Sequence, residues 1–529
     1  MNPFRRFAAD QDGFTLVAVT ISMMVLGIFA VSAWAAANNA LPMTGKDSDS
    51  KRAYEAAEAG VQWYQFQIQR DTNYWTKCAD TPNSIYLKGG RPAVSSTTGW
   101  RNVPGSAEAF AIELMGTTNS DSVCEADPGT ALLTDGVVTV RSTGRFNGKV
   151  RQIVAKFRRA GFIDYIYYTK RETAPPASYK NASDRTWAQN NCDTTRLHRP
   201  TTGLSSDSRV GCTEIQFRDS DVIAGPFHTE DSSVLVCGSP QFGNTSADKV
   251  EIASAPSSSA WYSQACSGTV TPTGTLSAPS KTLDLPKNNL QLASQATYTF
   301  RGNTCLRFSG STLTVYPTQT TWGTGGTINC TGATTTYTLG ANTVIWVANN
   351  GSCTDTYDYI QNYSNSSDCG DVAVSGSYGT NVTVGSEDDI IVTDDLRKGN
   401  TEAMMGLVAN QFVRVYHPVS PTNRTSNSSG CSNNGGSQVN YIDAAILATQ
   451  GSFLTDNWDC GTSLGTLNVT GAITQYWRGA VGTSGDSGYT KGYVYDPRLR
   501  YREPPNFLDP TTALWGVLRQ SEQSPVLTG

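Results

Sequence analysis

The chain has 529 residues, of which only 16% are charged, and its 40 Lys and Arg against 45 Asp and Glu give a net charge of -5. An ordinary globular domain carries about 25% charged residues, and no global excess of basic charge favours nucleic acid as a partner. The length corresponds to several domains or to one long repetitive β body.

The cysteine content indicates an oxidising compartment. The chain has 12 cysteines, from Cys78 to Cys460, and no pair has the CxxC spacing of a zinc or redox motif. With only 3 histidines, a structural metal site is not expected. Disulfides are the plain interpretation, so the body of the protein should lie outside the cytosol.

Residues 14–37 form an uncharged, mostly apolar segment near the N-terminus. As a helix it would extend about 36 Å, enough to cross a hydrocarbon core of about 30 Å. Arg5 and Arg6 precede it and favour a cytoplasmic location for that end. The segment therefore predicts a single-pass transmembrane helix. The alternative is a secretory signal cleaved near Ala33 and Ala35, which form an A-x-A-like site.

The junction GFTLV, residues 13–17, places a glycine directly before the apolar segment. This boundary resembles the class III-like signal peptide of prepilins, the precursors of type IV pilins and type II secretion pseudopilins. The resemblance implies a leader over residues 1–13, cleavage by prepilin peptidase between Gly13 and Phe14, and N-methylation of Phe14. The apolar helix would then be retained in the mature protein.

One residue departs from the family pattern. Prepilins usually have Glu as the fifth residue of the mature chain, where its carboxylate compensates the terminal amine of a neighbouring subunit, but this chain has Ala18. A buried, unpaired ammonium costs several kcal/mol. The resemblance then implies a rare minor pilin or a tip subunit and not a repeating shaft unit. Divergence in a membrane anchor that does not assemble is the alternative explanation.

A second helical pattern covers residues 47–70, so that the N-terminal helix is expected over residues 14–72. Small and aromatic residues recur there at spacings of three and four, which predicts one buried stripe. Its members are Ala53, Ala56, Ala57, Gly60, Val61, Tyr64 and Ile68. The segment AYEAAEAG, residues 53–60, resembles the same region of PilX-type minor pilins.

Residues 73–160 are expected to form a small pilin-like strand region. Asn147-Gly148 lies between two β-rich segments and predicts a hairpin. Residues 141–159 carry several basic side chains and no acid. Such a strip can hold phosphates, but a solvated hairpin face is the favoured interpretation.

Residues 161–510 are rich in Gly, Ser, Thr and Asn, with short β-branched segments every 20 to 30 residues and no helical pattern before about residue 511. This spacing predicts a right-handed parallel β-helix; a set of antiparallel β-sandwiches is the alternative. Residues 228–242, 406–418 and 493–510 look like segments of large bacterial prepilin-type proteins with β-helical bodies. The C-terminal tail, residues 511–529, is expected to contain a short helix from Ala513 to Gln520.

Cysteine connectivity cannot be deduced from sequence alone, and pairing between sequence neighbours is our guess. The expected pairs are Cys78 with Cys124, Cys192 with Cys212, Cys237 with Cys266, Cys305 with Cys330, Cys353 with Cys369, and Cys431 with Cys460.

No nucleophile elbow, zincin or P-loop motif is present. The best catalytic candidates are clustered acids, since β-helix enzymes that cleave polysaccharides use such groups. They are Glu387, Asp388, Asp389, Asp394 and Asp395. Turn residues at coil corners are the favoured interpretation, and His198, His228 and His417 are interpreted as structural. We therefore expect no enzyme activity, no cofactor and no metal.

Together these features predict a minor pilin or pilus-tip subunit of a type IV pilus-like filament, with its body at the cell surface. The expected partners are other pilin subunits, prepilin peptidase and the membrane. A surface or glycan ligand is a further candidate, because the polar body carries many of the 23 Tyr and 11 Trp. The alternatives are a membrane-anchored adhesin that forms no filament and, third, a polysaccharide-active enzyme.

Overall fold

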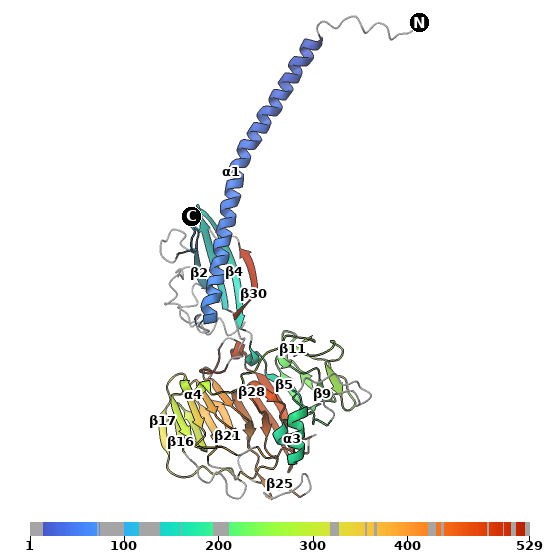
Figure 1. The fold of residues 1–529 in the computed structure, drawn as a ribbon, viewed down its shortest axis with the longest axis vertical. Helices are drawn as coiled ribbons and strands as arrows, with labels where there is room; N and C mark the ends of the chain where they lie inside the picture. Colours follow the sequence, from blue (N-terminus) through green and yellow to red (C-terminus); the bar gives the residue numbers. More distant parts are fainter. Residues whose placement is uncertain are drawn as a thin grey trace, which may run out of the picture. The chain divides into compact units, whose positions relative to one another are not determined.

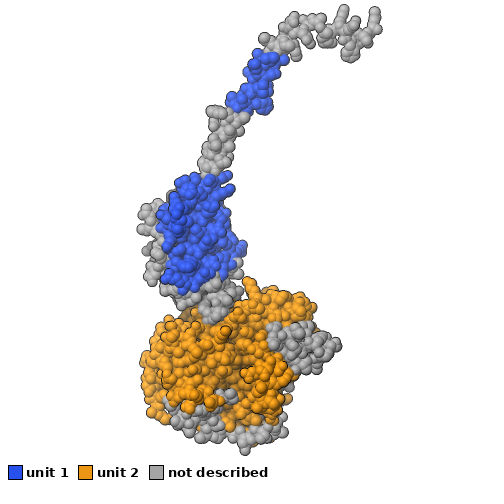
Figure 2. Space-filling view, in the orientation of Figure 1, with its two compact units in different colours: residues 1–158, 515–529 blue, residues 159–514 orange. Residues whose placement is uncertain are grey.

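The computed structural model describes residues 14–70, 74, 100–115, 138–159, 161–193, 211–317, 327–354, 357–363, 368–421, 430–434, 438–483, 486–500, 502–508 and 515–523. The chain forms two compact units, coloured separately in Figure 2. Unit 1 comprises Met1–Arg158 and Trp515–Gly529, and unit 2 comprises Arg159–Leu514. Unit 2 is therefore an insertion within the sequence of unit 1.

Unit 1 is one long helix on an antiparallel sheet (Figure 1). The helix is α1 (Phe14–Arg70), and the sheet has the order β1-β2-β3-β4-β30. The strands are β1 (Arg101–Asn102), β2 (Ala109–Met115), β3 (Val138–Phe146), β4 (Lys149–Arg159) and β30 (Trp515–Gln523).

The hairpin between β3 and β4 turns at Asn147-Gly148, as the sequence indicates. Phe146 pairs with Lys149 across a two-residue loop. Asn147 has φ 45° and Gly148 has φ 74°. Two consecutive positive φ angles are the requirement of a type I′ turn, which Asn-Gly meets at the lowest steric cost.

The C-terminal tail contains no helix in its described part. Residues 515–523 form β30, the edge strand next to β4, so the expectation of a helix from Ala513 to Gln520 is wrong. The segment WGVLRQSEQ has the residue preferences of either structure, and the open edge of β4 decides between them. Arg151 of β4 and Glu522 of β30 form an ion pair at 3.1 Å.

Unit 2 is mainly β, as expected, and most of its strands pair in parallel. One ladder contains ten strands, each hydrogen bonded to the next. In spatial order they are β14 (Tyr298–Arg301), β18 (Thr343–Ala348), β20 (Val382–Ser386), β22 (Met405–Ala409), β26 (Tyr441–Ala448), β28 (Ser463–Trp477), β5 (Tyr167–Arg171), β8 (Phe227–Thr229), β11 (Lys249–Ile252) and β13 (Thr275–Ser277).

A single stack of side chains follows this ladder through the core. One residue from each strand is in register with the next. The stack is Tyr298, Ile345, Val384, Leu407, Ile446, Ile473, Tyr167, Phe227, Val250 and Leu276. Its inner members are buried and its two end members are partly buried, so each coil covers the apolar face of its neighbour.

Further parallel strands run beside this ladder. The second series is β15 (Thr304–Gly310), β19 (Val372–Tyr378), β21 (Ile390–Lys398), β23 (Val413–Val415) and β27 (Phe453–Thr455). The third continues from β28 through β29 (Gly488–Tyr495), β7 (Val222–Ala224) and β10 (Gln241–Phe242). A separate sheet contains β6 (Phe217–Arg218), β9 (Val234–Cys237) and β12 (Tyr262–Gln264).

Two small antiparallel groups complete the strands. Strands β16 (Thr312–Tyr316) and β17 (Thr335–Thr338) extend β15. Strands β24 (Val419–Ser420) and β25 (Ser432–Asn433) pair with each other.

Short helices also occur in unit 2, where none was expected. The α-helices are α3 (Ala182–Asn191) and α4 (Gln291–Gln295), and the 3-10 helices are η3 (Phe162–Asp164), η4 (Pro176–Ser178) and η5 (Pro497–Arg500). Helix α3 has one buried side chain, Ala188. A polar helix with so small an apolar contact gives no periodic signal.

The order of strands in space differs from their order in sequence. Strand β28, near the end of unit 2, pairs with β5, near its start, and β29 pairs likewise with β7. The hydroxyl of Tyr495 donates to the carbonyl of Ile163 at 3.2 Å. The two ends of the insertion therefore lie side by side, which allows the chain to return to unit 1 as β30.

The close approach of α1 to β3 generates the first prediction. A Cβ on Gly144 would lie 2.0 Å from the carbonyl oxygen of Ala53 and 2.3 Å from the amide nitrogen of Ala57. Gly144→Ala should therefore separate the helix from the sheet and destabilise unit 1 by about 1–3 kcal/mol. Peptide-resolved hydrogen exchange on the full chain in detergent should report lower protection in α1 and β3 and unchanged protection in unit 2.

Gly27→Ala is the matched control for this prediction, since a Cβ at Gly27 meets no atom within 4 Å. Equal protection of β3 in the Gly144→Ala protein and the control would contradict the tight helix-sheet contact.

Candidate functional site

The second half of α1 is fixed on the sheet of unit 1. All seven residues of the expected stripe are buried, from Ala53 to Ile68. The small side chains admit β3 closely, and the ring of Tyr64 lies 5.7 Å from the ring of Phe157 on β4. The stripe is therefore a packing surface within the unit and is not free to bind a partner.

Charged side chains also take part in the packing of unit 1. The guanidinium of Arg52 on α1 forms an ion pair with Glu108 and lies 3.7 Å from the centre of the Phe146 ring. On β3, Arg145 lies 4.1 Å from the ring of Trp100. Arg145, which belongs to the basic strip of residues 141–159, and Arg52 of α1 thus each contact an aromatic ring of the same unit.

The first half of α1 has the opposite environment. Every residue from 18 to 32 is exposed, and the apolar side chains of Met24 and Phe29 expose 71% and 67% of their surface. No ionisable side chain occurs between Phe14 and Lys46. Hydroxyls in this part bond to the helix itself: Ser22 Oγ donates to the carbonyl of Ala18 at 2.7 Å.

So large an apolar surface is unfavourable in water, because soluble monomers rarely expose continuous apolar patches of more than a few hundred Å². Among the described residues, none of the helices combines the length and hydropathy that a membrane span requires. The span expected over residues 14–37 is accordingly not confirmed.

Of the two expected processing residues, the structure describes one. Phe14 is the first residue of α1, and Gly13 lies outside the described residues.

Disulfide bonding of the body is confirmed. Within the described residues, five bonds join cysteines that are neighbours in the sequence: Cys192 with Cys212, Cys237 with Cys266, Cys305 with Cys330, Cys353 with Cys369, and Cys431 with Cys460. Cys78 and Cys124 lie outside the described residues.

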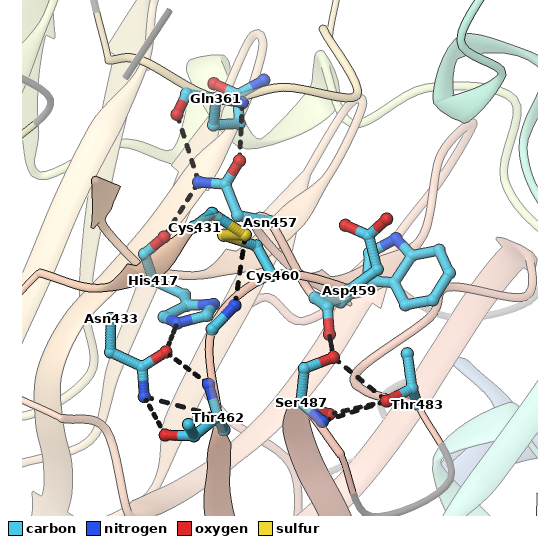
Figure 3. Close-up of a disulfide and its surroundings, with 12 residues drawn as sticks. Gln361, His417, Cys431, Asn433, Asn457, Asp459, Cys460, Thr462, Thr483 and Ser487 are labelled. Atoms are coloured by element: carbon cyan, nitrogen blue, oxygen red, sulfur yellow. Dashed lines mark hydrogen bonds between the residues drawn. A yellow bond between two sulfur atoms is a disulfide. The ribbon is translucent and has the colours of Figure 1, made fainter. Parts of the chain in front are cut away.

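Figure 3 shows the bond between Cys431 and Cys460 with its polar surroundings. The ring of His417 contacts the side-chain oxygen of Asn433 at 3.2 Å, and that oxygen accepts from the amide of Thr462 at 3.1 Å. Burial lowers the pKa of His417, and its hydrogen bonds oppose this only in part. His417 therefore links Asn433 of β25 to the carbonyl of Asp456 as a neutral side chain, which fits the structural role expected from the sequence.

His228 lies between two carboxylates in the core. Its Nε2 is 3.0 Å from Glu230 Oε1, its Nδ1 is 3.1 Å from Glu251 Oε2, and it stacks on Tyr168. Burial alone would lower the pKa of His228, but the hydrogen bonds to Glu230 and then Glu251 outweigh it and raise that pKa. His228 has no exposed surface, so it has a structural charge-pairing role. His198 lies outside the described residues.

The acids named as catalytic candidates have partners within the fold. Asp389 is buried and pairs with Arg414 at 3.1 Å; burial raises its pKa to about 7, against the opposing charge of Arg414. Asp394 accepts from the amide of Asp395 at 2.8 Å, and Asp395 accepts from the amide of Asn440 at 2.7 Å.

The other two candidate acids, Glu387 and Asp388, lie between strands β20 and β21. Glu387 accepts from the amide of Asn349 at 2.8 Å, and Asp388 lies beside the disulfide of Cys353 and Cys369. Capping of backbone amides is the role expected of acids at turns.

No protein-family model and no curated protein matches this chain. Among solved structures, the crystal structure of the competence-associated pilin ComZ from Thermus thermophilus is similar over 90% of this chain and 97% of its own, with 12% identity and a TM-score of 0.31.

The two buried histidines predict opposite effects of pH. The raised pKa of His228 gives stability that is complete below the unfolded pKa of about 6.5 and is lost as pH rises through the folded pKa. The lowered pKa of His417 gives stability that is complete above about 6.5 and is lost as pH falls towards the folded value. We therefore expect the natural protein to have a higher free energy of unfolding than the His228→Asn variant, and we expect this difference to be largest at acidic pH. Urea unfolding of the full chain across this pH range measures the difference.

His417→Asn is the matched comparison, and the advantage of the natural protein over it should be largest at neutral and higher pH. The same pH slope for both variants would contradict the assigned charge states.

Proposed function

We propose that the protein is a subunit of a type IV pilus-like filament. The main support for this proposal is the contrast between the two halves of helix α1. The second half packs on an antiparallel sheet, whereas residues 18–32 expose apolar side chains on every side. An apolar helix without a partner in its own chain requires an apolar environment. The same helix of neighbouring subunits would supply it in a filament core.

Processing and location follow from the sequence around this helix. The junction of residues 13–17 supports cleavage by prepilin peptidase between Gly13 and Phe14 and methylation of the new amine. Before assembly, the apolar segment of residues 14–37 would lie in the membrane as a single span, with the leader in the cytoplasm and the body outside. The disulfides of the body are compatible with an oxidising exterior.

Ala18 supports a minor or tip position. An acid at this position would compensate the terminal amine of a neighbour, and Ala18 offers only a methyl group. A repeating shaft of such subunits would contain one uncompensated ammonium for each contact, at several kcal/mol each. A subunit present in few copies or at the end of the filament avoids that cost.

We further infer that unit 2 is one right-handed parallel β-helix displayed at the cell surface. The ten-strand parallel ladder and its single stack of core residues support this fold, and parallel connections are right-handed in nearly all proteins. The acids that could have served catalysis are engaged with Arg414 and with backbone amides, which supports a role without enzyme activity.

A membrane-anchored adhesin is the second candidate, because lipid could cover residues 18–32 as well as other subunits could. Recovery of the protein in sheared surface filaments favours the filament subunit, and exclusive recovery in the membrane favours the anchor.

The first test of the proposed function is the mature N-terminus. Mass spectrometry of the protein from its native membrane should find a chain that begins at N-methylated Phe14. Gly13→Leu should leave the leader attached, since a bulky side chain hinders access to the scissile bond. Gly27→Leu, within the exposed part of α1, should be processed normally. A mature start near Asn38 or an intact Met1 would refute prepilin processing.

The second test concerns Ala18. Ala18→Glu supplies the missing carboxylate and should raise the amount of the subunit in sheared filaments several-fold, by compensating the terminal amine. Ala18→Gln has nearly the same shape without the charge and should leave the amount unchanged. Equal incorporation of both variants would contradict the electrostatic explanation, whereas N-terminal processing would still be tested independently.

A further inference from the structure

A groove of about 1640 Å³ lies in unit 2. Four of its lining residues, which form the floor, lie at or close to the ends of neighbouring ladder strands: Gln411 after β22, Gln450 after β26, Tyr476 in β28 and Lys170 in β5. Four rungs at the usual strand spacing give a floor about 14 Å long. Single small ligands occupy about 300–1,000 Å³, so the groove has room for a chain of several units.

The walls of the groove are fixed before any ligand binds. The lining segment that contains Asn288 and Gln291 is held by the buried Asn289, whose side chain donates to a carbonyl of β20 at 2.6 Å and to a carbonyl of β22 at 2.9 Å. Elsewhere in the lining, Asp193 accepts from Arg171 Nε at 3.0 Å and from the hydroxyl of Tyr476 at 2.9 Å. A preformed groove binds without the entropic cost of ordering its walls.

The groove has no net charge. Its charged side chains are Lys170, Arg185, Lys287, Asp193, Asp284 and Glu503, three basic and three acidic. Several of them are neutralised locally, as Arg185 is by Asp358 at 3.2 Å. This balance does not fit a nucleic acid or another polyanion, which requires an excess of Lys and Arg.

Amide side chains dominate the remaining polar surface. Five of them make no hydrogen bond to any described residue: Gln189, Gln291, Gln295, Gln411 and Asn506. Each amide offers donors and an acceptor, which match hydroxyl groups that both donate and accept. An array of such groups suits a ligand with hydroxyls along its whole length.

Aromatic rings supply the apolar contacts. Tyr476 is partly exposed in the groove, whereas Tyr357 and Phe412 are buried in its lining beside each other, with ring centres 4.8 Å apart. A second cavity of about 450 Å³ shares Tyr357 and Pro175 with the groove. Its lining includes Tyr179, Tyr359 and Trp458, and its volume suits one unit or a branch of a chain.

We propose that this groove binds a neutral oligosaccharide chain, with a terminal or branching sugar in the smaller cavity. Sugar hydroxyls would bond to the amides, and the C–H faces of the rings would pack on the aromatic side chains. An extended peptide is a poorer fit, because the strands under the groove are already paired on both sides and offer no free edge. The proposal concerns unit 2 and does not depend on filament assembly.

The test uses the full chain in detergent with a printed array of neutral gluco-, galacto-, manno- and N-acetylhexosamine oligosaccharides of increasing length. Uronic-acid chains, single-stranded DNA and extended peptides serve as competing probes. The neutral chain that gives the strongest signal is then titrated by calorimetry. Affinity should increase with chain length and change little with salt.

The variant for this titration is the double substitution Gln291→Ala with Gln411→Ala. Neither side chain bonds to a described residue, so thermal stability should not change, while affinity for the selected neutral chain should fall about tenfold or more. Gln438→Ala is the control, since this exposed glutamine of the same unit does not line the groove.

Three results would overturn the proposal: no binding of any neutral chain on the array, stronger binding of a competing probe, or equal affinity in the double variant and the control. Each leaves the proposed filament function untouched, because that function is tested by the N-terminus and by Ala18.

Discussion

The pairing of β28 with β5 is the contact on which the arrangement of the chain depends. It joins the end of the inserted unit to its beginning, with Ile473 opposite Tyr167. A buried ion pair secures the same junction, because Arg478, just after β28, bonds to Glu172, just after β5, at 2.8 Å. Breaking such a pair by removing one partner typically costs about 3–5 kcal/mol. As a result, strands from the beginning and from near the end of the inserted sequence lie in one sheet of unit 2, while β30 completes the sheet of unit 1 on which α1 packs.

Although charged residues are few, some of them form buried ion pairs in unit 2. Several of its few basic side chains are buried with acids, including Arg414 with Asp456 at 2.9 Å and Lys491 with Asp221 at 2.7 Å. A buried pair gains little net stability against its desolvation cost, yet it tolerates only one arrangement. In a stack of similar coils, where slipping by one rung would preserve most apolar contacts, these pairs distinguish the native register from its neighbours. We regard this as the physical reason for charges in so apolar a core.

The sequence predicts local features of the fold well and long-range features poorly. The small-residue stripe of α1 and the Asn147-Gly148 turn depend on spacing and on backbone preference, so they can be identified without the structure. Strand β30 cannot, because its conformation is decided by the edge of β4, distant in sequence. Likewise α3 carries almost no apolar periodicity, and the groove combines residues from Lys170 to Leu508. None of its amides belongs to a motif, and only the tertiary fold brings them together, since Gln189 lies on α3, Gln291 on α4 and Gln411 after β22.

The two surfaces that require a partner differ in chemistry and lie in different units. Residues 18–32 are apolar and uncharged, so what covers them must be apolar, and the contact gains its energy from area with little directional demand. The groove is polar, uncharged overall and built on fixed strands, so its selectivity depends on the positions of individual donors and acceptors. Because the surfaces share no residue, substitutions in the groove can change ligand preference while the helix, its sheet and any assembly that depends on them stay the same. An insertion whose ends adjoin provides this independence, since the inserted unit has its own core and meets the sequence of unit 1 only at its two ends.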